Sequence, residues 1–263
     1  MSQNTTNGLL EVSHEGPITW VKLTRPEKRN AINIQLIQAL HNCFASMPNT
    51  TKAIVLHGEG EHFCAGLDLS EISEQTVPES VLHSRTWHAA FEHIQFGKAP
   101  VIAVLHGAVV GGGLELASAA HLRIAEPSTF YALPEGKRGL FVGGGGSVRI
   151  SRLIGVANMS DLMLTGRVYN CQEGHNAGIS QYVVEANQGL EKAAELAKNI
   201  ASNASMTNYG VMHLLPRIAD QSIHDGLATE SLMAAVAQTD PATLDLLQQF
   251  LQGKNKVKYK PEG

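Results

Sequence analysis

Short apolar runs separated by polar loops mark the first half of the chain. The runs at residues 9–12 and 18–24 predict two strands, joined by a hairpin turn at residues 14–17. Two further runs, at residues 53–56 and 101–105, are apolar without alternation. Runs of this length and kind are typical of strands that are covered on both faces, so the pattern predicts an α/β fold.

Apolar residues recur at helical spacing after the second predicted strand. Asn30 is expected to cap this helix, which should end before Pro48 because proline cannot continue it. The apolar positions that define the helix are Ile34, Ile37, Leu40 and Phe44.

Helical patterning also fills the last quarter of the chain. No repeat or Pro/Ser-rich linker interrupts the sequence, so we expect one domain with a core at residues 1–195 and a helical region at residues 196–263. Asp240-Pro241 is a typical helix start. The expected helices lie at residues 190–204, around 211–218, at 226–238 and at 243–252.

The loop after the run at residues 101–105 contains three consecutive glycines, Gly111, Gly112 and Gly113. Residues 114–120 favour helix, which places these glycines at a helix N-terminus. Free N–H groups and the positive end of the helix dipole face a ligand there, and glycine lets the ligand come close to the backbone. Taken alone, however, three glycines are equally typical of a simple turn.

Composition and charge exclude several classes of function. The formal net charge is -4 and the basic residues are scattered, so no basic stripe is present for nucleic acid. No run of apolar residues is long enough to span a membrane, and the first residues lack the pattern of a signal peptide. We therefore expect a cytoplasmic protein with no nucleic-acid and no membrane partner.

Metal and nucleotide sites are also disfavoured. Three widely spaced cysteines without a Cys-x-x-Cys pair predict neither a disulfide framework nor a thiolate site. His83, His88 and His93 cannot share one helix face, because each step of five residues turns a helix by about 140°. The absence of a Gly-x-Gly-x-x-Gly turn and of a P-loop disfavours NAD and ATP.

Several motifs follow one another in a distinctive order. They are Phe63-Cys64-Ala65-Gly66-Leu67-Asp68-Leu69, Gly111-Gly112-Gly113-Leu114-Glu115-Leu116, and Leu133-Pro134-Glu135 followed by Gly143-Gly144-Gly145-Gly146. Arg25-Pro26, Asn30-Ala31 and residues 164–167 add further signatures. In this order the chain resembles the enoyl-CoA hydratase/isomerase (crotonase) family over nearly its whole length.

The resemblance implies a crotonase-like α/β fold, which is a spiral of ββα units with a helical C-terminal trimerisation region. A homo-oligomer, either a trimer or a dimer of trimers, is therefore expected. The resemblance also implies an acyl-CoA thioester as the substrate. Coenzyme A is then part of the substrate, and neither a separate cofactor nor a metal is expected.

The resemblance assigns roles to residues of the central motifs. The backbone N–H groups of Leu67 and Gly112 would form an oxyanion hole for the thioester oxygen, where charge develops during proton transfer at the α carbon. Glu115 and Glu135 would be the acid/base pair, and Gly143 would lie beside the water site. Outside this family, Glu115 would be interpreted as a helix N-terminal carboxylate and Glu135 as an exposed charge.

The resemblance also indicates where the substrate and its CoA part bind. Lys28 or Arg29 would contact the phosphates, although a solvated basic turn is equally typical of such a segment. The backbone around Ala65 would lie near the adenine, and Leu67 and Asp68 are expected to contact the substrate as well. The acyl pocket is expected to involve the helix around residues 87–91.

The presence of both glutamates favours addition of water to the double bond of an α,β-unsaturated acyl-CoA. Residues 66–71, residues 106–113 and the lysine-containing end are similar to methylthioacryloyl-CoA hydratases. Two alternatives use the same scaffold, namely thioester hydrolysis, alone or after hydration, and enoyl-CoA isomerisation. A third is a non-catalytic acyl-CoA-binding subunit, because ligand binding and assembly need neither glutamate.

Overall fold

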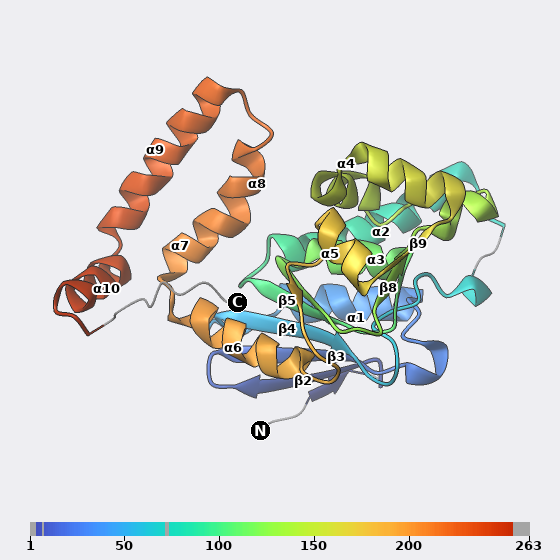
Figure 1. Cartoon of the computed structure of the whole chain (residues 1–263), viewed down its shortest axis with the longest axis horizontal. Coiled ribbons are helices and arrows are strands. Elements are labelled where there is room, and N and C mark those ends of the chain that lie inside the picture. The colour runs from blue at the N-terminus through green and yellow to red at the C-terminus, as the bar shows by residue number, and fades with distance from the viewer. Residues whose placement is uncertain (1–3, 7, 72–73, 255–263) are drawn as a thin grey trace. The chain divides into compact units, whose positions relative to one another are not determined.

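The structure, a computed structural model, describes residues 4–6, 8–71 and 74–254 (Figure 1). The chain forms two compact units, residues 1–201 and 202–263. The division expected after residue 195 falls inside α6 (Gly189–Ser202), whose apolar side packs against the sheet of the first unit. Because this helix is one continuous element, nearly all of it belongs to the first unit.

The first unit is built on a seven-stranded sheet with the order β1-β2-β3-β4-β5-β7-β10. The first three strands are antiparallel neighbours, and from β3 onward every neighbouring pair is parallel. The predicted hairpin is confirmed as β2 and β3, and the two apolar runs are β4 and β5. The strands are β1 (Asn4–Thr6), β2 (Leu10–Glu15), β3 (Ile18–Leu23), β4 (Ala53–Gly58), β5 (Val101–Leu105), β7 (Leu122–Ala125) and β10 (Tyr182–Val183).

Both faces of this sheet are buried at β4 and β5, which explains the apolar runs without alternation. On β4, Ile54 and Leu56 belong to one apolar cluster, whereas Ala53 and Val55 belong to another. The second cluster includes the buried side of α6, which lies along that face (Figure 1). Helices α1, α2 and α3 contribute to the first cluster. The other helices of this unit are η1 (Pro26–Lys28), α1 (Ile34–Ala45), η2 (Leu69–Glu71), α2 (Val77–Gln95), α3 (Gly112–Ala119), η3 (Pro134–Arg138), α4 (Gly146–Thr165) and α5 (Cys171–Ala177).

A small sheet with the order β6-β8-β9 positions two of the segments that the sequence singled out. β6 leads through Gly111 into α3, and β8 leads into η3. Because β6 and β8 are parallel neighbours, the segments after their carboxyl ends start close together. The Gly111 N–H also donates to the Ala132 carbonyl at 2.9 Å, which ties these ends to each other. The strands are β6 (Ala108–Val110), β8 (Phe130–Ala132) and β9 (Val168–Asn170).

The cap of α1 differs from the prediction. Asn33, not Asn30, is the N-cap, and its side chain accepts a hydrogen bond from the Leu36 N–H at 2.9 Å. Asn30 is fully buried at a φ of 54°, a conformation that asparagine tolerates. Its side-chain amide donates to the carbonyls of Glu59 and His62 at 3.0 and 2.7 Å. Asn30 therefore joins the turn before α1 to the loop after β4.

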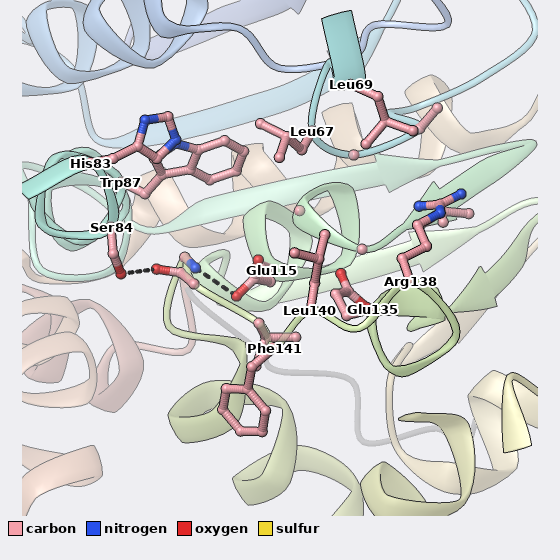
Figure 2. A pocket seen from close by; sticks show the side chains of 18 residues that line it. Leu67, Leu69, His83, Ser84, Trp87, Glu115, Glu135, Arg138, Leu140 and Phe141 are labelled. Atoms are coloured by element: carbon pink, nitrogen blue, oxygen red, sulfur yellow. Dashed lines mark hydrogen bonds between the residues drawn. The ribbon is translucent and has the colours of Figure 1, made fainter. Parts of the chain in front are cut away.

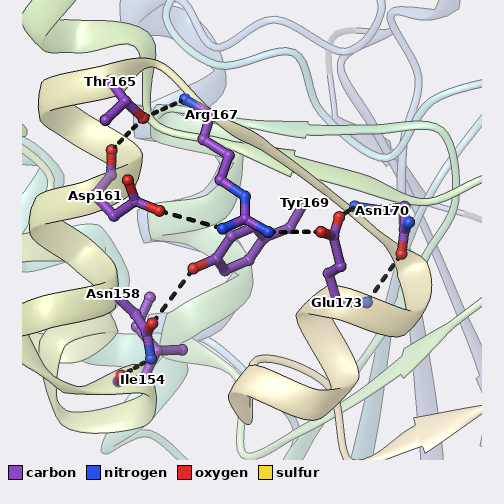
Figure 3. A network of polar contacts seen from close by, with 8 residues as sticks. All are labelled: Ile154, Asn158, Asp161, Thr165, Arg167, Tyr169, Asn170 and Glu173. Atoms are coloured by element: carbon purple, nitrogen blue, oxygen red, sulfur yellow. Dashed lines mark hydrogen bonds and ion pairs between the residues drawn. The ribbon is translucent and has the colours of Figure 1, made fainter.

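A polar network fixes the connection from α4 through β9 to α5 (Figure 3). Gly166 ends α4 at a φ of 71°, a conformation that favours glycine. The Arg167 guanidinium binds Asp161 at 3.5 Å and Glu173 at 2.7 Å, and it lies over the ring of Tyr169. Because the Arg167 side chain is half exposed, we expect these ion pairs to set the direction of β9 more than to stabilise the fold.

The second unit is helical, as the C-terminal pattern predicts. Its first helical stretch begins earlier than expected, at Ser205, and continues through a π-helical middle to Ile218. Asp240 caps the last helix, as predicted, with Pro241 at its first position. In the described ranges, no helix is both long and apolar enough to cross a membrane. The elements are α7 (Ser205–Tyr209), η4 (Gly210–Leu214), α8 (Leu215–Ile218), α9 (Ile223–Thr239) and α10 (Pro241–Leu251).

We expect Asn30→Ala to lower the free energy of unfolding by about 2 kcal/mol. The substitution removes the donor from two carbonyls and places alanine at a positive φ. Urea unfolding followed by circular dichroism measures the change. Asn176→Ala, at an exposed position, is the control and should change stability by less than about 0.5 kcal/mol. An Asn30→Ala protein as stable as the wild type would contradict this role.

Candidate active site

A cavity lies between α2 and the loops that follow β4, β6 and β8 (Figure 2). It contains about 600 Å³ of space including its open mouth. Six of the residues to which the resemblance assigned a role in the site line this cavity: Ala65, Leu67, Gly112, Glu115, Glu135 and Gly143.

Glu115 lies on the first turn of α3 and faces this cavity (Figure 2). The residue is only 3% exposed, and its Oε1 accepts hydrogen bonds from the N–H groups of Gly144 and Gly146, both at 2.8 Å. Burial raises the pKa of Glu115 to about 7, and the charge of Glu135 adds to the rise. The two N–H groups and Arg149 lower the pKa again in part. Glu115 can therefore gain and lose a proton near neutral pH.

Glu135 reaches the same cavity from η3. Its Oε2 is buried and has no hydrogen-bond partner among the residues that the structure describes. Burial raises the pKa of Glu135, while its own backbone N–H and the charge of Arg138 oppose the rise. Gly111 leaves room for the carboxylate, since a Cβ there would lie 2.6 Å from Glu135 Oε1. The cavity thus holds two carboxyl groups, one bound by two backbone N–H groups and one whose Oε2 has no hydrogen-bond partner among the described residues.

Two backbone N–H groups, those of Leu67 and Gly112, lie close together at this cavity. The residues on either side of Leu67 both bond to the backbone of Ile32, so the Leu67 N–H points to the opposite side. A Cβ on Gly112 would lie 3.4 Å from the Leu67 nitrogen, and one on Gly66 would lie 3.3 Å from the Gly112 nitrogen. Within the described part of the chain, neither N–H donates to a backbone carbonyl. Both are therefore available to one ligand oxygen.

Residues 143–146, the glycine strap, end at the first residue of α4 and lie against Glu115. Gly143 lines the cavity, and its carbonyl accepts a hydrogen bond from Ser84 Oγ at 2.5 Å. The sequence did not reveal that Gly144 and Gly146 bind Glu115, although the run of four glycines signals a close backbone approach. A Cβ on Gly146 would lie 2.8 Å from Glu115 Cγ, so a larger residue would displace the carboxylate.

Helix α2 forms one wall of the cavity, as expected for the stretch around Trp87. The indole ring lies against two backbone segments, because a Cβ on Gly112 or Gly144 would come within 2.8 or 3.1 Å of it. Trp87 Nε1 donates to His83 Nε2 at 3.1 Å. His83 and Ser84 also line the cavity, and sequence reasoning missed both. Their position one helical turn before residues 87 and 88 is the signal that would have found them.

Two of the predicted CoA-binding residues lie next to the cavity rather than in it. Lys28 and Arg29 are exposed and do not line the cavity. The Ala65 N–H donates to the Arg29 carbonyl at 3.0 Å, and Ala65 itself lines the cavity. This hydrogen bond joins the basic turn to the cavity edge.

Asp68 has a different place from the one expected of a substrate-binding residue. Its carboxylate accepts a hydrogen bond from Ser70 Oγ at 2.7 Å and pairs with Arg25 at 3.0 Å, and it does not line the cavity. These two partners hold the pKa of Asp68 below its usual value. Because the pair is largely buried, Asp68 anchors the loop that carries Leu67.

Known proteins share this fold and much of this sequence. The family model for enoyl-CoA hydratase/isomerase matches residues 13–257. A crystal structure from Rhodopseudomonas palustris CGA009, assigned to the enoyl-CoA hydratases, is 51% identical with a TM-score of 0.92, and the match covers 97% of this chain and 98% of that one. The short-chain-enoyl-CoA hydratase of Clostridium acetobutylicum is 30% identical over 82% of this chain and 84% of its own length. The carnitinyl-CoA dehydratase of Proteus mirabilis matches to the same extent, at 30% over 82% and 84%.

The chain belongs to the enoyl-CoA hydratase/isomerase family, because the model of that family matches nearly its whole length. The crotonase-like fold predicted from the motifs is thereby confirmed, including the helical C-terminal region. An enoyl-CoA hydratase from Bacillus anthracis, 28% identical with a TM-score of 0.88 over 95% of this chain and 98% of its own, has the same fold. The assembly into trimers stays a prediction.

We expect Glu115→Gln to gain stability relative to the wild type as the pH rises. The folded pKa of about 7 lies above the ordinary value of 4.5, so the folded state holds this proton more tightly than the unfolded chain does. This proton therefore contributes to the free energy of unfolding. The contribution is fully present below the unfolded pKa and is lost as the pH rises through the folded pKa, by up to about 3 kcal/mol. Glutamine stays neutral and avoids this loss.

Urea unfolding at about pH 5 and about pH 8 gives the free energy of unfolding of the variant and of the wild type. The variant's advantage in this free energy should be larger at the higher pH. Glu185→Gln, at an exposed position, is the matched control, and its difference should be the same at both pH values. Equal differences for Glu115→Gln would show that Glu115 titrates as an ordinary glutamate.

Proposed function

We propose that the protein is an enoyl-CoA hydratase, which adds water across the double bond of an α,β-unsaturated acyl-CoA. One observation carries this proposal, namely that two carboxyl groups with raised pKa values and two available backbone N–H groups share one cavity. Hydration of such a thioester needs a base for the water, an acid for the α carbon and donors for the thioester oxygen. The cavity residues match each requirement.

In the proposed reaction, the N–H groups of Leu67 and Gly112 hold the thioester oxygen. One glutamate, Glu115 or Glu135, takes a proton from water beside Gly143, and the water oxygen bonds to the β carbon. The electrons of the double bond move toward the thioester oxygen, where the two N–H groups stabilise the enolate. The other glutamate then gives its proton to the α carbon, and the carbonyl re-forms. Because protein groups supply every proton and donor, the scheme needs no cofactor and no metal.

We propose that the CoA part of the substrate extends along the turn of Lys28 and Arg29. Both side chains are exposed, and the backbone hydrogen bond between Arg29 and Ala65 joins this turn to the cavity. Exposed Lys and Arg side chains bind phosphate groups through charge-assisted hydrogen bonds.

For the acyl group, we propose a short chain, with methylthioacryloyl-CoA as the first candidate. Trp87, Leu69 and Leu140 line the cavity, and a thioether sulfur packs favourably against an aromatic ring. The motifs at residues 66–71 and 106–113 support this choice, whereas the lysine-containing end lies almost entirely outside the described residues. The relatives named for a short-chain enoyl-CoA and for carnitinyl-CoA indicate that family membership alone leaves the acyl group open.

Both glutamates are expected to be required for hydration. Glu115→Gln and Glu135→Gln should each lower kcat for crotonyl-CoA by about 10²–10⁴, because each removes one proton transfer. Loss of the conjugated thioester absorbance measures hydration, with methylthioacryloyl-CoA tested in parallel. Glu185→Gln is the matched control and should keep the wild-type rate.

A free-thiol assay on the same samples separates hydration from hydrolysis, because only hydrolysis releases CoA. Movement of the double bond without uptake of water would indicate an isomerase. Acyl-CoA binding without turnover of any acyl group would refute the proposed activity and support a binding subunit.

We also propose that the protein forms trimers, alone or paired, through apolar side chains of the second unit. In that unit, Ile223, Leu232 and Leu251 are 79%, 71% and 83% exposed. Large apolar side chains this exposed on successive helices of a small unit indicate that part of its surface is covered in an assembly. The contact partners are expected to be copies of the same chain.

Sedimentation equilibrium should therefore give a mass about three or six times the chain mass of 28.2 kDa. Leu232→Glu should lower the average mass by weakening the interface. A wild-type mass equal to that of one chain would contradict the proposed assembly.

A further inference from the structure

The glycine strap holds Glu115 through two of its peptide groups. The N–H groups of Gly144 and Gly146 both donate to Glu115 Oε1 at 2.8 Å. Consecutive glycines have no side chains to restrict their backbone angles, and Gly145 has a φ of 96°. Other residues must therefore hold these peptide groups in the orientation that Glu115 requires.

Ser84 on α2 binds the peptide group between Gly143 and Gly144 at its carbonyl end. The Gly143 carbonyl accepts a hydrogen bond from Ser84 Oγ at 2.5 Å, and this carbonyl belongs to the same planar peptide as the Gly144 N–H. Rotation of that peptide would break both hydrogen bonds together. Figure 2 shows the resulting chain of contacts, from Ser84 through one peptide group to Glu115. Hydrogen bonds in such a chain also strengthen one another by polarisation.

Arg149 on α4 holds the next peptide group. Its Nη1 donates to the Gly144 carbonyl at 3.1 Å, and its Nε donates to Gln95 Oε1 of α2 at 2.6 Å. Arg149 also acts on Glu115 through its charge, so its replacement would change Glu115 in two ways. Ser84 carries no charge and lines the cavity, which makes it the residue whose replacement isolates the orientation of the peptide.

We propose that Ser84 is a positioning residue, whose hydroxyl keeps the Gly143–Gly144 peptide turned so that its N–H stays bound to Glu115. This role rests on the proposed hydratase function, in which Glu115 transfers a proton. Without the hydroxyl, the His88 ring still binds the Gly143 backbone, but the peptide is held less firmly and Glu115 loses part of the hydrogen bond from one of its two N–H donors. Because an N–H donor favours the ionised carboxylate, this loss raises the pKa of Glu115 further.

The other groups around Glu115 do not depend on the serine. Glu135 on η3 and Arg149 on α4 are the charged groups that act on Glu115, and neither is hydrogen-bonded to Ser84. His88 Nε2 lies 3.4 Å from Ser84 Oγ, and the His88 ring is also hydrogen-bonded to the Gly143 backbone, while burial lowers the pKa of His88. A change in the pKa of Glu115 on removal of the serine hydroxyl therefore reports a change in the orientation of the Gly143–Gly144 peptide group.

The test compares Ser84→Ala with the wild type, with Ser84→Thr and with Ser80→Ala, a control one turn earlier on α2. Two quantities are measured: kcat and KM for crotonyl-CoA across pH, and the titration of the Glu115 carboxyl group by infrared difference spectroscopy. Glu115→Gln identifies the band that belongs to Glu115.

For Ser84→Ala, we expect kcat to fall about ten-fold with little change in KM, and the titration midpoint of Glu115 to move to higher pH. Ser84→Thr keeps the hydroxyl and should restore both values, whereas Ser80→Ala should change neither. Thermal unfolding checks that each variant is folded. If Ser84→Ala does not fold, Ser84→Cys gives the same test, because a thiol is of similar size but donates weakly.

The two proposals fail in different ways. An unchanged Glu115 titration without the serine hydroxyl overturns the positioning role, whatever the activity does. A wild-type protein that hydrates no acyl-CoA, combined with a shifted titration in Ser84→Ala, refutes the hydratase function but supports the positioning of Glu115 by Ser84.

Discussion

The Glu115 carboxyl group is buried in an apolar wall, and the surrounding structure has to offset the cost of its charge. Two neutral backbone N–H groups stabilise the charge by donating hydrogen bonds to Oε1. Arg149 stabilises it only by electrostatic attraction, without a hydrogen bond to the carboxylate. A direct ion pair would have lowered the pKa and fixed the carboxylate in its charged form. Backbone donors instead leave the pKa at about 7, where both protonation states are accessible near neutral pH.

The backbone comes so close to the two carboxyl groups and to Trp87 that a Cβ would clash there, which explains the concentration of glycine around the cavity. Gly146 lies against Glu115, and Gly111 lies against Glu135. Gly112 and Gly144 admit the ring of Trp87, which closes the same wall. The glycines therefore allow both the close packing and the hydrogen bonds to Glu115. Because glycine backbones are conformationally free, side chains from α2 and α4 have to hold them in place.

Parallel pairing brings the chemical groups to one place. β6 and β8 run side by side, so the helices that follow them deliver Glu115 and Glu135 to one cavity. The isolated bridge between Ile32 and Leu67 turns the Leu67 N–H toward Gly112. Two carboxyl groups and two amide donors thus converge, although their positions in the chain extend from residue 67 to residue 135. This convergence suits a reaction in which protons move while charge develops on one oxygen.

Local patterns were sufficient for the buried strands, for the helix that begins at Gly112 and for the cap at Asp240, because these depend on neighbours within a few residues. The ordered motifs identified the family and, through it, the two glutamates that share the cavity. The tertiary structure alone decided how individual polar side chains are used.

Asn30 appeared to be a helix cap but binds the loop at His62, and Asp68 was expected at the substrate but pairs with Arg25. These partners lie 32 and 43 residues away, and Ser84 binds Gly143 across 59 residues. A buried polar group must find a hydrogen-bond partner, and which partner is near depends on packing between distant segments. The sequence by itself therefore determined several of the strands and helices, the family and the acid/base candidates, whereas only the folded chain decided which residues hold those candidates in place.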